Sequence, residues 1–219
     1  MSSLYEMFHA GGIWMYPIMA AQIVSLALIG ERVLALYANR APNLKKRARQ
    51  FEEDIKKGQM DRVISRTDRS QNDVISLLAR TGAESVLQHS GKEEIQLKMD
   101  ELVMEESSRI EKRIGLLAMI ANVATLLGLL GTIVGMIHSF ASISSTSGAE
   151  KARLLSQGIS EAMNATAYGL IVAVPALVMF AILQNRANNL TEDLQKAALR
   201  MYIWFGFGVE SPSQKKRIS

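Results

Sequence analysis

The sequence has no cysteine among its 219 residues. This absence excludes disulfide bonds, thiolate catalysis and cysteine-containing metal sites. There is also no Lys or Arg before Arg32, although a long apolar stretch precedes that residue. Because a secretory signal begins with basic residues and ends at a small-residue cleavage site, we expect this stretch to be retained as a membrane span.

Charged residues are missing from three long stretches of the chain. These stretches lie between Glu6 and Glu31, between Arg113 and Glu150, and between Glu161 and Arg186. A helix needs about 20 apolar residues to cross a hydrocarbon core about 30 Å thick. We therefore predict an all-α membrane protein with three transmembrane helices, although 21% of its residues are charged.

Basic residues are distributed unevenly around these spans. Of the 25 Lys and Arg, 17 lie in residues 32–113, six in residues 186–217, and only Lys151 and Arg153 between spans two and three. The positive-inside rule then predicts a periplasmic N-terminus and a cytoplasmic C-terminus. Acidic residues are interleaved with the basic ones, which argues against nucleic-acid binding.

These observations predict six segments along the chain. They are an outer N-terminal segment with the first transmembrane helix (1–38), a cytoplasmic helical region (39–113), the second transmembrane helix (114–143), a short periplasmic loop with a helix start (144–160), the third transmembrane helix (161–185), and a cytoplasmic helix extension with a basic tail (186–219). Helices two and three are both expected to extend into the cytoplasm.

Two capping-box spacings predict where the long helices begin. Ser90 and Glu93 form the first, and no proline follows before Ile143. We therefore expect a single helix of about 75 Å that begins just after Ser90 and contains span two. Ser147 and Glu150 form the second spacing, at the end of a turn rich in Ser and Thr.

The second of these helices is expected to begin at Gly148 and to contain span three. Pro175 is expected to interrupt it within the membrane, because proline removes one backbone hydrogen bond. Apolar residues keep a helical spacing beyond the membrane as far as Phe205. We expect Gly206 and Gly208 to end the helix.

Small and hydroxylated residues follow one face of span two and one face of span three. In span two they are Ala118, Ala121, Thr125, Gly128, Thr132, Gly135 and Ser139. In span three they are Ala162, Thr166, Gly169, Ala173 and Ala176. Two helices with such faces either pack closely against each other or line a narrow interior, and the spacing alone leaves both interpretations open.

Candidate residues follow for each interpretation. The helix-packing candidates are the small residues and the proline: Gly128, Gly131, Gly135, Gly169, Ala173 and Pro175. The ion-path candidates are polar: Asn122, Thr125, Thr132, Ser139, Glu161 and Thr166. Hydroxyls suit an ion path because each donates and accepts hydrogen bonds without adding a fixed charge. For Asn122, packing or an interhelical hydrogen bond is an equally open interpretation.

No Asp, Glu, Lys or Arg lies deep inside any of the three spans. An ionisable residue at membrane depth is costly and is expected where ions pass, so this absence indicates a second subunit that supplies one. Glu161 lies at the mouth of span three. It either helps to gate or hydrate the ion path, or it forms an ordinary interfacial pair with Lys151 or Arg153. We expect His138 to be a satisfied polar residue near the outer interface.

The sequence has no Gly-rich phosphate loop, nucleophile elbow or cluster of metal ligands. His9 and His89 have no partners at ligand spacing, so we expect no metal site and no cofactor. These observations argue against an enzyme. A basic cluster in residues 45–49 suits anionic lipid headgroups.

Two runs of sequence resemble the ExbB/TolQ family. The run LLGLLGTIVGM at residues 126–136 is similar to the second-span motif of that family. The run ISEAMNATAYGL at residues 159–170, followed by VPA at 174–176, is similar to its third-span motif. The chain length and the large cytoplasmic segment also agree. The more distant flagellar stator A-subunits are longer and have a fourth span, for which we find no candidate here.

The resemblance implies a homo-oligomer, a pentamer, in the bacterial inner membrane around a central pore. The pentamer would enclose the spans of two copies of an ExbD/TolR-like partner, whose aspartate carries the proton and is faced by Thr132 and Thr166. Such a motor powers outer-membrane transport, envelope maintenance or gliding through a TonB/TolA-like or gliding effector. Two alternatives stay open, a structural adaptor without ion conduction and a sodium-driven motor.

Overall fold

The computed structural model describes residues 12–38, 44–67, 73–143 and 148–214. No strand lies within these ranges. Three helical stretches are long and apolar enough to cross a membrane: Met15–Tyr37, Lys92–Ala141 and Glu150–Gly206. The prediction of an all-α protein with three candidate membrane helices is confirmed. The helices form two compact units, one of residues 1–35 and 113–184, the other of residues 36–112 and 185–219.

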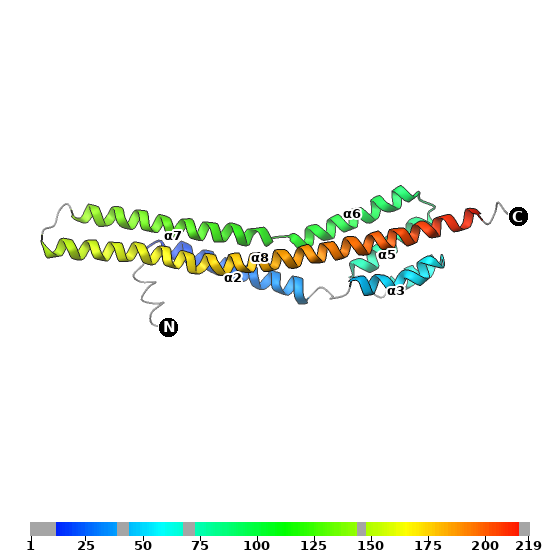
Figure 1. The fold of residues 1–219 in the computed structure, drawn as a ribbon, viewed down its shortest axis with the longest axis horizontal. Coiled ribbons are helices and arrows are strands. Elements are labelled where there is room, and N and C mark those ends of the chain that lie inside the picture. The colour runs from blue at the N-terminus through cyan, green and yellow to red at the C-terminus, as the bar shows by residue number, and fades with distance from the viewer. Residues whose placement is uncertain (1–11, 39–43, 68–72, 144–147, 215–219) are drawn as a thin grey trace. The chain divides into compact units, whose positions relative to one another are not determined.

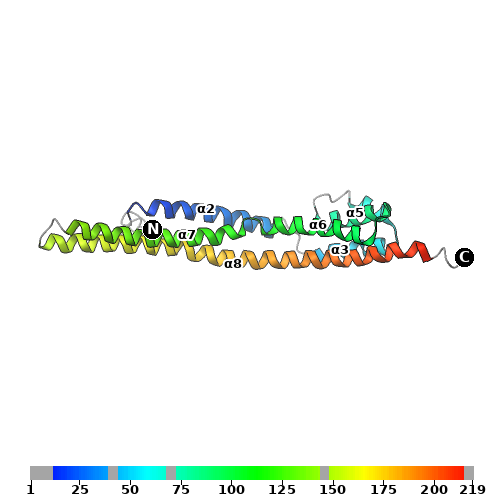
Figure 2. The ribbon, with the colours of Figure 1, turned by 90° about the horizontal axis from the view of Figure 1, so that it is seen from above.

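The first unit contains α2 (Met15–Val33), α7 (Ile114–Ile143) and the first part of α8 (Ala149–Gln214). These three lie side by side in both ribbon views (Figures 1 and 2). All three contribute to one buried core of Ile18, Ala121, Ala124, Val172, Ala173 and Ala176. Most of its members are alanines, so the helix axes can approach closely.

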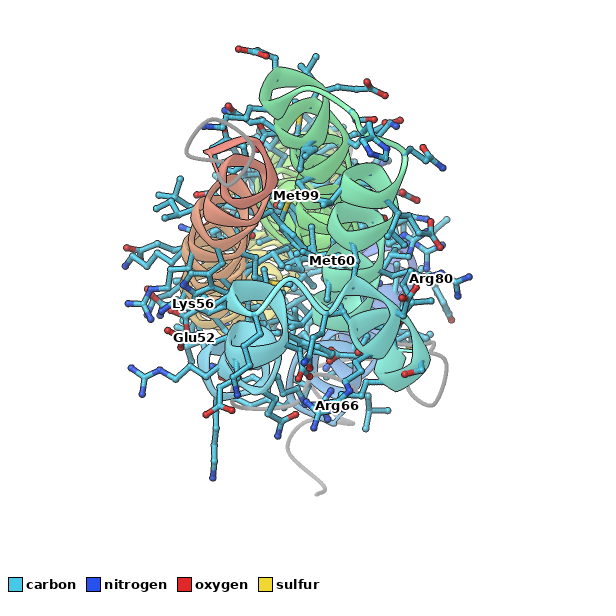
Figure 3. The ribbon with its side chains drawn as sticks, turned by 90° about the vertical axis from the view of Figure 1, so that its right-hand side faces the viewer. Glu52, Lys56, Met60, Arg66, Arg80 and Met99 are labelled. Atoms are coloured by element: carbon cyan, nitrogen blue, oxygen red, sulfur yellow. The ribbon has the colours of Figure 1, made fainter. Side chains whose placement is uncertain are left out.

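The second unit contains four shorter helices and the remainder of α8. The four are α3 (Leu44–Lys56), α4 (Met60–Thr67), α5 (Val74–Leu87) and α6 (Lys92–Glu111). A π-helical turn, η1 (Leu34–Ala38), follows α2. Met60 and Met99 lie inside this unit, whereas Arg66 and Arg80 lie at its edge (Figure 3). These two arginines thus lie outside an apolar interior, as expected of amphipathic helices.

The expected single helix from Ser90 to Ile143 is wrong, because the chain breaks between α6 and α7. Arg113 adopts the left-handed conformation, with φ of 63°. This conformation costs a residue other than glycine roughly 1–2 kcal/mol. The Arg113 guanidinium donates to both carboxylate oxygens of Glu31 on α2, at 2.8 and 3.0 Å, and this exposed ion pair connects the break to α2. The N-cap of α6 is Gly91, not Ser90.

The break at Arg113 predicts which of two substitutions at this position gives the more stable protein. Arg113→Gly and Arg113→Ala both remove the ion pair with Glu31, so their difference reports on the backbone alone. Glycine reaches positive φ without strain, so we expect the glycine variant to be more stable by about 1 kcal/mol. Thermal unfolding in one detergent measures the difference. If α6 and α7 were one continuous helix, alanine would be more stable by a similar amount.

Two expectations for α8 are also wrong. The helix passes through Pro175 without interruption, and it continues past Gly206 and Gly208 to Gln214. Pro175 removes only one backbone hydrogen bond, and a glycine costs a helix only about 1 kcal/mol, so neither ends a helix of 66 residues. The helix begins at Ala149, and Gly148 before it has φ of 68°. Ser147, the expected cap, lies outside the described residues, as does the end of the basic tail.

Candidate functional site

Glycines of α7 and α8 meet in a close helix contact, which we call the glycine seam (Gly128, Gly131, Gly135 and Gly169). A Cβ built on Gly169 would lie 2.8 Å from the carbonyl oxygen of Ala124, and one built on Gly128 would lie 3.2 Å from that of Ala165. Such distances leave no room for a side chain. The two small faces therefore pack against each other within one subunit over this part of their length.

The partners in the seam show that α7 and α8 run antiparallel. Gly128 faces Thr166 and Gly169, whereas Gly135, about two turns further along α7, faces Ala162. The short turn predicted between the two spans accounts for this pairing, because neighbouring helices with a short connection pack antiparallel. Ala173 is also buried in the core of this unit, whereas Pro175 is exposed.

Three ion-path candidates of α7 lie beside the seam and not in it. At 100° per residue, Thr132 and Thr125 are turned about 40° and 60° from Gly128. Thr132 is half-buried, and Thr125 and Asn122 are exposed. The spacing on the sequence assigned glycines and threonines to one face, but the structure uses the glycines for packing and leaves the two threonines at the border. Asn122 is turned about 120° from Gly128 and lies further away.

The threonine hydroxyls have different hydrogen-bond partners. Thr125 donates to the carbonyl of Ala121 at 3.0 Å, and Thr132 donates to that of Leu129 at 2.6 Å, both within α7. Thr166 instead crosses the seam and donates to the carbonyl of Gly128 at 2.8 Å. Each hydroxyl keeps lone pairs that can accept a hydrogen bond. Thr166 therefore also fastens α8 to α7, which Thr132 does not.

The first membrane helix, α2, lies on the side of the seam opposite the threonines. A Cβ built on Gly131 would lie 3.4 Å from the Cβ of Trp14, at the start of α2. Further along α2, Gln22 accepts a hydrogen bond from the Tyr168 hydroxyl of α8. On helical geometry, Thr125, Thr132 and Thr166 lie on the side of the seam away from α2.

Glu161 and Ser139 belong to a different place from the threonines. Both line a partly open cavity of about 360 Å³ within the first unit, which we call the outer cavity. Ser139 is only 4% exposed and donates to the carbonyl of Gly135 at 2.7 Å. The half-buried carboxylate of Glu161 lies against Gly12, where a Cβ would come within 1.9 Å of Oε1.

The remaining walls of the outer cavity come from two helices, α7 and α8, and from the residues just before α2. They are Ile13, Trp14, Gly131, Val134, Gly135, His138, Leu154, Gln157 and Gly158. The cavity thus lies beside α2, on the opposite side of the seam from the threonines. Glu161, which the sequence grouped with the threonines, does not share a surface with them in this chain. Ser139 lies between α7 and α8, where a Cβ built on Gly158 would come within 1.6 Å of its Oγ.

Sequence reasoning missed the Gln22–Tyr168 hydrogen bond and the contribution of Trp14. Gln22 gave a signal, because an amide in an otherwise apolar span needs a partner. Trp14 gave none beyond its position near the membrane surface. In the basic cluster of residues 45–49, Arg47 pairs with Asp73 at 2.8 Å. Among the described residues, no three His, Cys, Asp or Glu side chains come together as metal ligands.

The sequence of this chain matches a known protein family. The model of the MotA/TolQ/ExbB proton channel family matches residues 70–196, more than half of the chain. The chain belongs to this family. The match includes the whole of α7 and the part of α8 that forms the glycine seam, so the MotA/TolQ/ExbB motifs coincide with the packed faces and the threonines. The family consists of proton channels of membrane motors and not of a known class of enzyme.

Two curated relatives show the same membership. The Tol-Pal system protein TolQ of Haemophilus influenzae is 36% identical over 90 residues, which cover 40% of this chain and 38% of the relative. The biopolymer transport protein ExbB of Pseudomonas putida is 28% identical over 112 residues, which cover 51% of this chain and 34% of the relative. The matches thus span little more than a third of these MotA/TolQ/ExbB relatives.

A solved structure has a similar fold. The structure of C. jejuni MotAB matches with a TM-score of 0.65 and 15% identity, and the match covers 91% of this chain and 80% of the other. At this identity the likeness concerns the fold alone. The similarity of fold extends over nearly the whole chain.

Proposed function

We propose that this chain is the scaffold subunit of an inner-membrane motor that the proton-motive force drives. Five copies surround the spans of an ExbD/TolR-like partner, whose aspartate carries the proton. The motor powers outer-membrane transport, envelope maintenance or gliding. Family membership supports this proposal, as do the apolar spans, which carry hydroxyls but no Asp, Glu, Lys or Arg at depth. A chain of this composition needs a partner's carboxylate to relay protons.

The observation that carries the proposal is the position of Thr132. Its side chain is half-buried beside the seam, away from α2, and its lone pairs can accept a hydrogen bond. A neighbouring helix on that side meets a hydroxyl instead of an entirely apolar surface. A hydroxyl stabilises a carboxylic acid or its anion without adding a charge. A surface without fixed charges suits a part that turns past its neighbours.

Thr132→Val tests this role more cleanly than Thr166→Val, because Thr166 also holds α8 to Gly128. The complex is purified from its own membranes with whatever single-span protein accompanies it, and native mass spectrometry gives the composition. Proton flux into vesicles is then measured with a pH-sensitive dye. We expect Thr132→Val to keep the assembly and to lower the flux on the order of tenfold, the factor that corresponds to one lost hydrogen bond of about 1.4 kcal/mol.

The matched control is Thr132→Ser, which keeps the hydroxyl and should retain most of the flux. Normal flux in the valine variant with the assembly intact would favour a structural adaptor. Flux that follows external sodium at constant pH would favour the sodium-driven alternative. Absence of any single-span partner with an aspartate would overturn the proposed motor.

A further inference from the structure

The outer cavity has the size and the chemistry of a hydrated site. Its volume of about 360 Å³ is that of roughly a dozen water molecules in the liquid, at about 30 Å³ each. Its walls bring together a carboxylate, an amide, an imidazole and a hydroxyl, from Glu161, Gln157, His138 and Ser139. A dry cavity in a protein is apolar, whereas a roomy cavity with several polar groups holds water.

Trp14 gives an independent indication. Its indole Nε1 is buried and has no hydrogen-bond partner among the described residues. A buried donor without an acceptor costs about 1–3 kcal/mol, so such groups in native proteins usually bond to a protein group or to ordered water. Trp14 also forms part of the cavity wall, which places this unsatisfied donor next to the cavity.

Small residues create this space and also separate it from the threonines. Gly131, Gly135 and Gly158 are all in the wall, and Gly131 and Gly135 also form the seam with α8. A Cβ built on Gly135 would lie 3.0 Å from that of Ala162, so the seam is tightly closed. Water on the Glu161 side does not reach Thr132 through such a contact.

We propose that the outer cavity is a water-filled chamber inside each subunit, separate from the threonine face, which gives small hydrated cations, hydronium above all, access to the Glu161 carboxylate. The sequence placed Glu161 and Thr132 on one ion path, but the geometry assigns them to two compartments. The chamber deepens the proposed function and rests on it only for the direction of ion flow.

Thiol labelling tests the chamber, because a single introduced cysteine is the only thiol in the chain. Val134→Cys lies in the cavity wall, whereas Ile133→Cys is one residue away on the same helix, 50% exposed and outside that wall. A thiol reacts as the thiolate, which forms in water and not in hydrocarbon. Open membrane fragments are treated with a cationic and an anionic methanethiosulfonate, so that the reagent reaches both faces.

We expect the cationic reagent to modify Val134→Cys on the order of tenfold faster than Ile133→Cys, since only the former thiol is in water. At Val134→Cys the cationic reagent should also react several-fold faster than the anionic one, and adding Glu161→Gln should remove this preference. Equal rates at the two positions would overturn the chamber. A cation preference that persists in Glu161→Gln would overturn the role of Glu161.

The labelling needs neither a partner nor ion-driven activity, so its outcome is independent of the proposed function. If Thr132→Val leaves the flux unchanged while Val134→Cys is labelled quickly, the motor assignment fails and the chamber stands. If the flux falls but Val134→Cys reacts no faster than Ile133→Cys, the motor stands and the chamber fails.

Discussion

Gly169→Ala is expected to destabilise the membrane unit by about 1–3 kcal/mol, the usual cost of overpacking. The added methyl would lie 2.8 Å from the carbonyl oxygen of Ala124 and next to the Cα of Gly128. Both obstacles are backbone atoms, which cannot rotate away as a side-chain end can. The two helices must therefore separate, and the hydrogen bond from Thr166 to Gly128 lengthens with them.

Gly115→Ala is the matched control, because nothing lies within 4 Å of a Cβ at that position of α7. Alanine is the better helix former, so this variant should be unchanged or up to about 1 kcal/mol more stable. Thermal unfolding of both purified proteins in the same detergent provides the comparison. Equal stability of the two variants would show that Gly169 does not face α7.

Phe205→Ala is expected to destabilise the second unit by about 3–5 kcal/mol, as removal of a buried aromatic ring usually does. Phe205 is fully buried, and its ring lies on Gly82 of α5, where a Cβ would come within 2.2 Å of the ring Cε2. The absence of a side chain at Gly82 makes the space that the ring fills. Thermal unfolding of the full chain measures the loss.

A pair of size-exchanging substitutions tests whether the two residues are coupled. Gly82→Ala alone should destabilise through overpacking, and Phe205→Leu alone should leave a cavity. Together they should cost at least about 0.5 kcal/mol less than the sum of the two, since residues in contact are not additive. Strict additivity would contradict the contact between α5 and the end of α8.

How much the sequence could predict differs between the helices and their ends. The three apolar spans followed from the gaps between charges, because a membrane span depends on composition over about 20 residues. The break at Arg113 did not, since no glycine or proline marks it and its stabilising partner, Glu31, is distant in the sequence. Likewise, Pro175 did not break α8, because the loss of one backbone hydrogen bond leaves the rest of this long helix intact.

For the candidate site, the sequence by itself determined the residue types: small residues for close approach, hydroxyls without fixed charge, and one acid at the mouth of span three. Only the tertiary structure decided which of them face each other. Helical periodicity puts Thr132 only about 40° from Gly128, and it does not say which of the two faces the neighbouring helix. Which neighbour occupies each side of a helix depends on contacts between distant segments, and these placed Thr132 and Glu161 on opposite sides of the same seam.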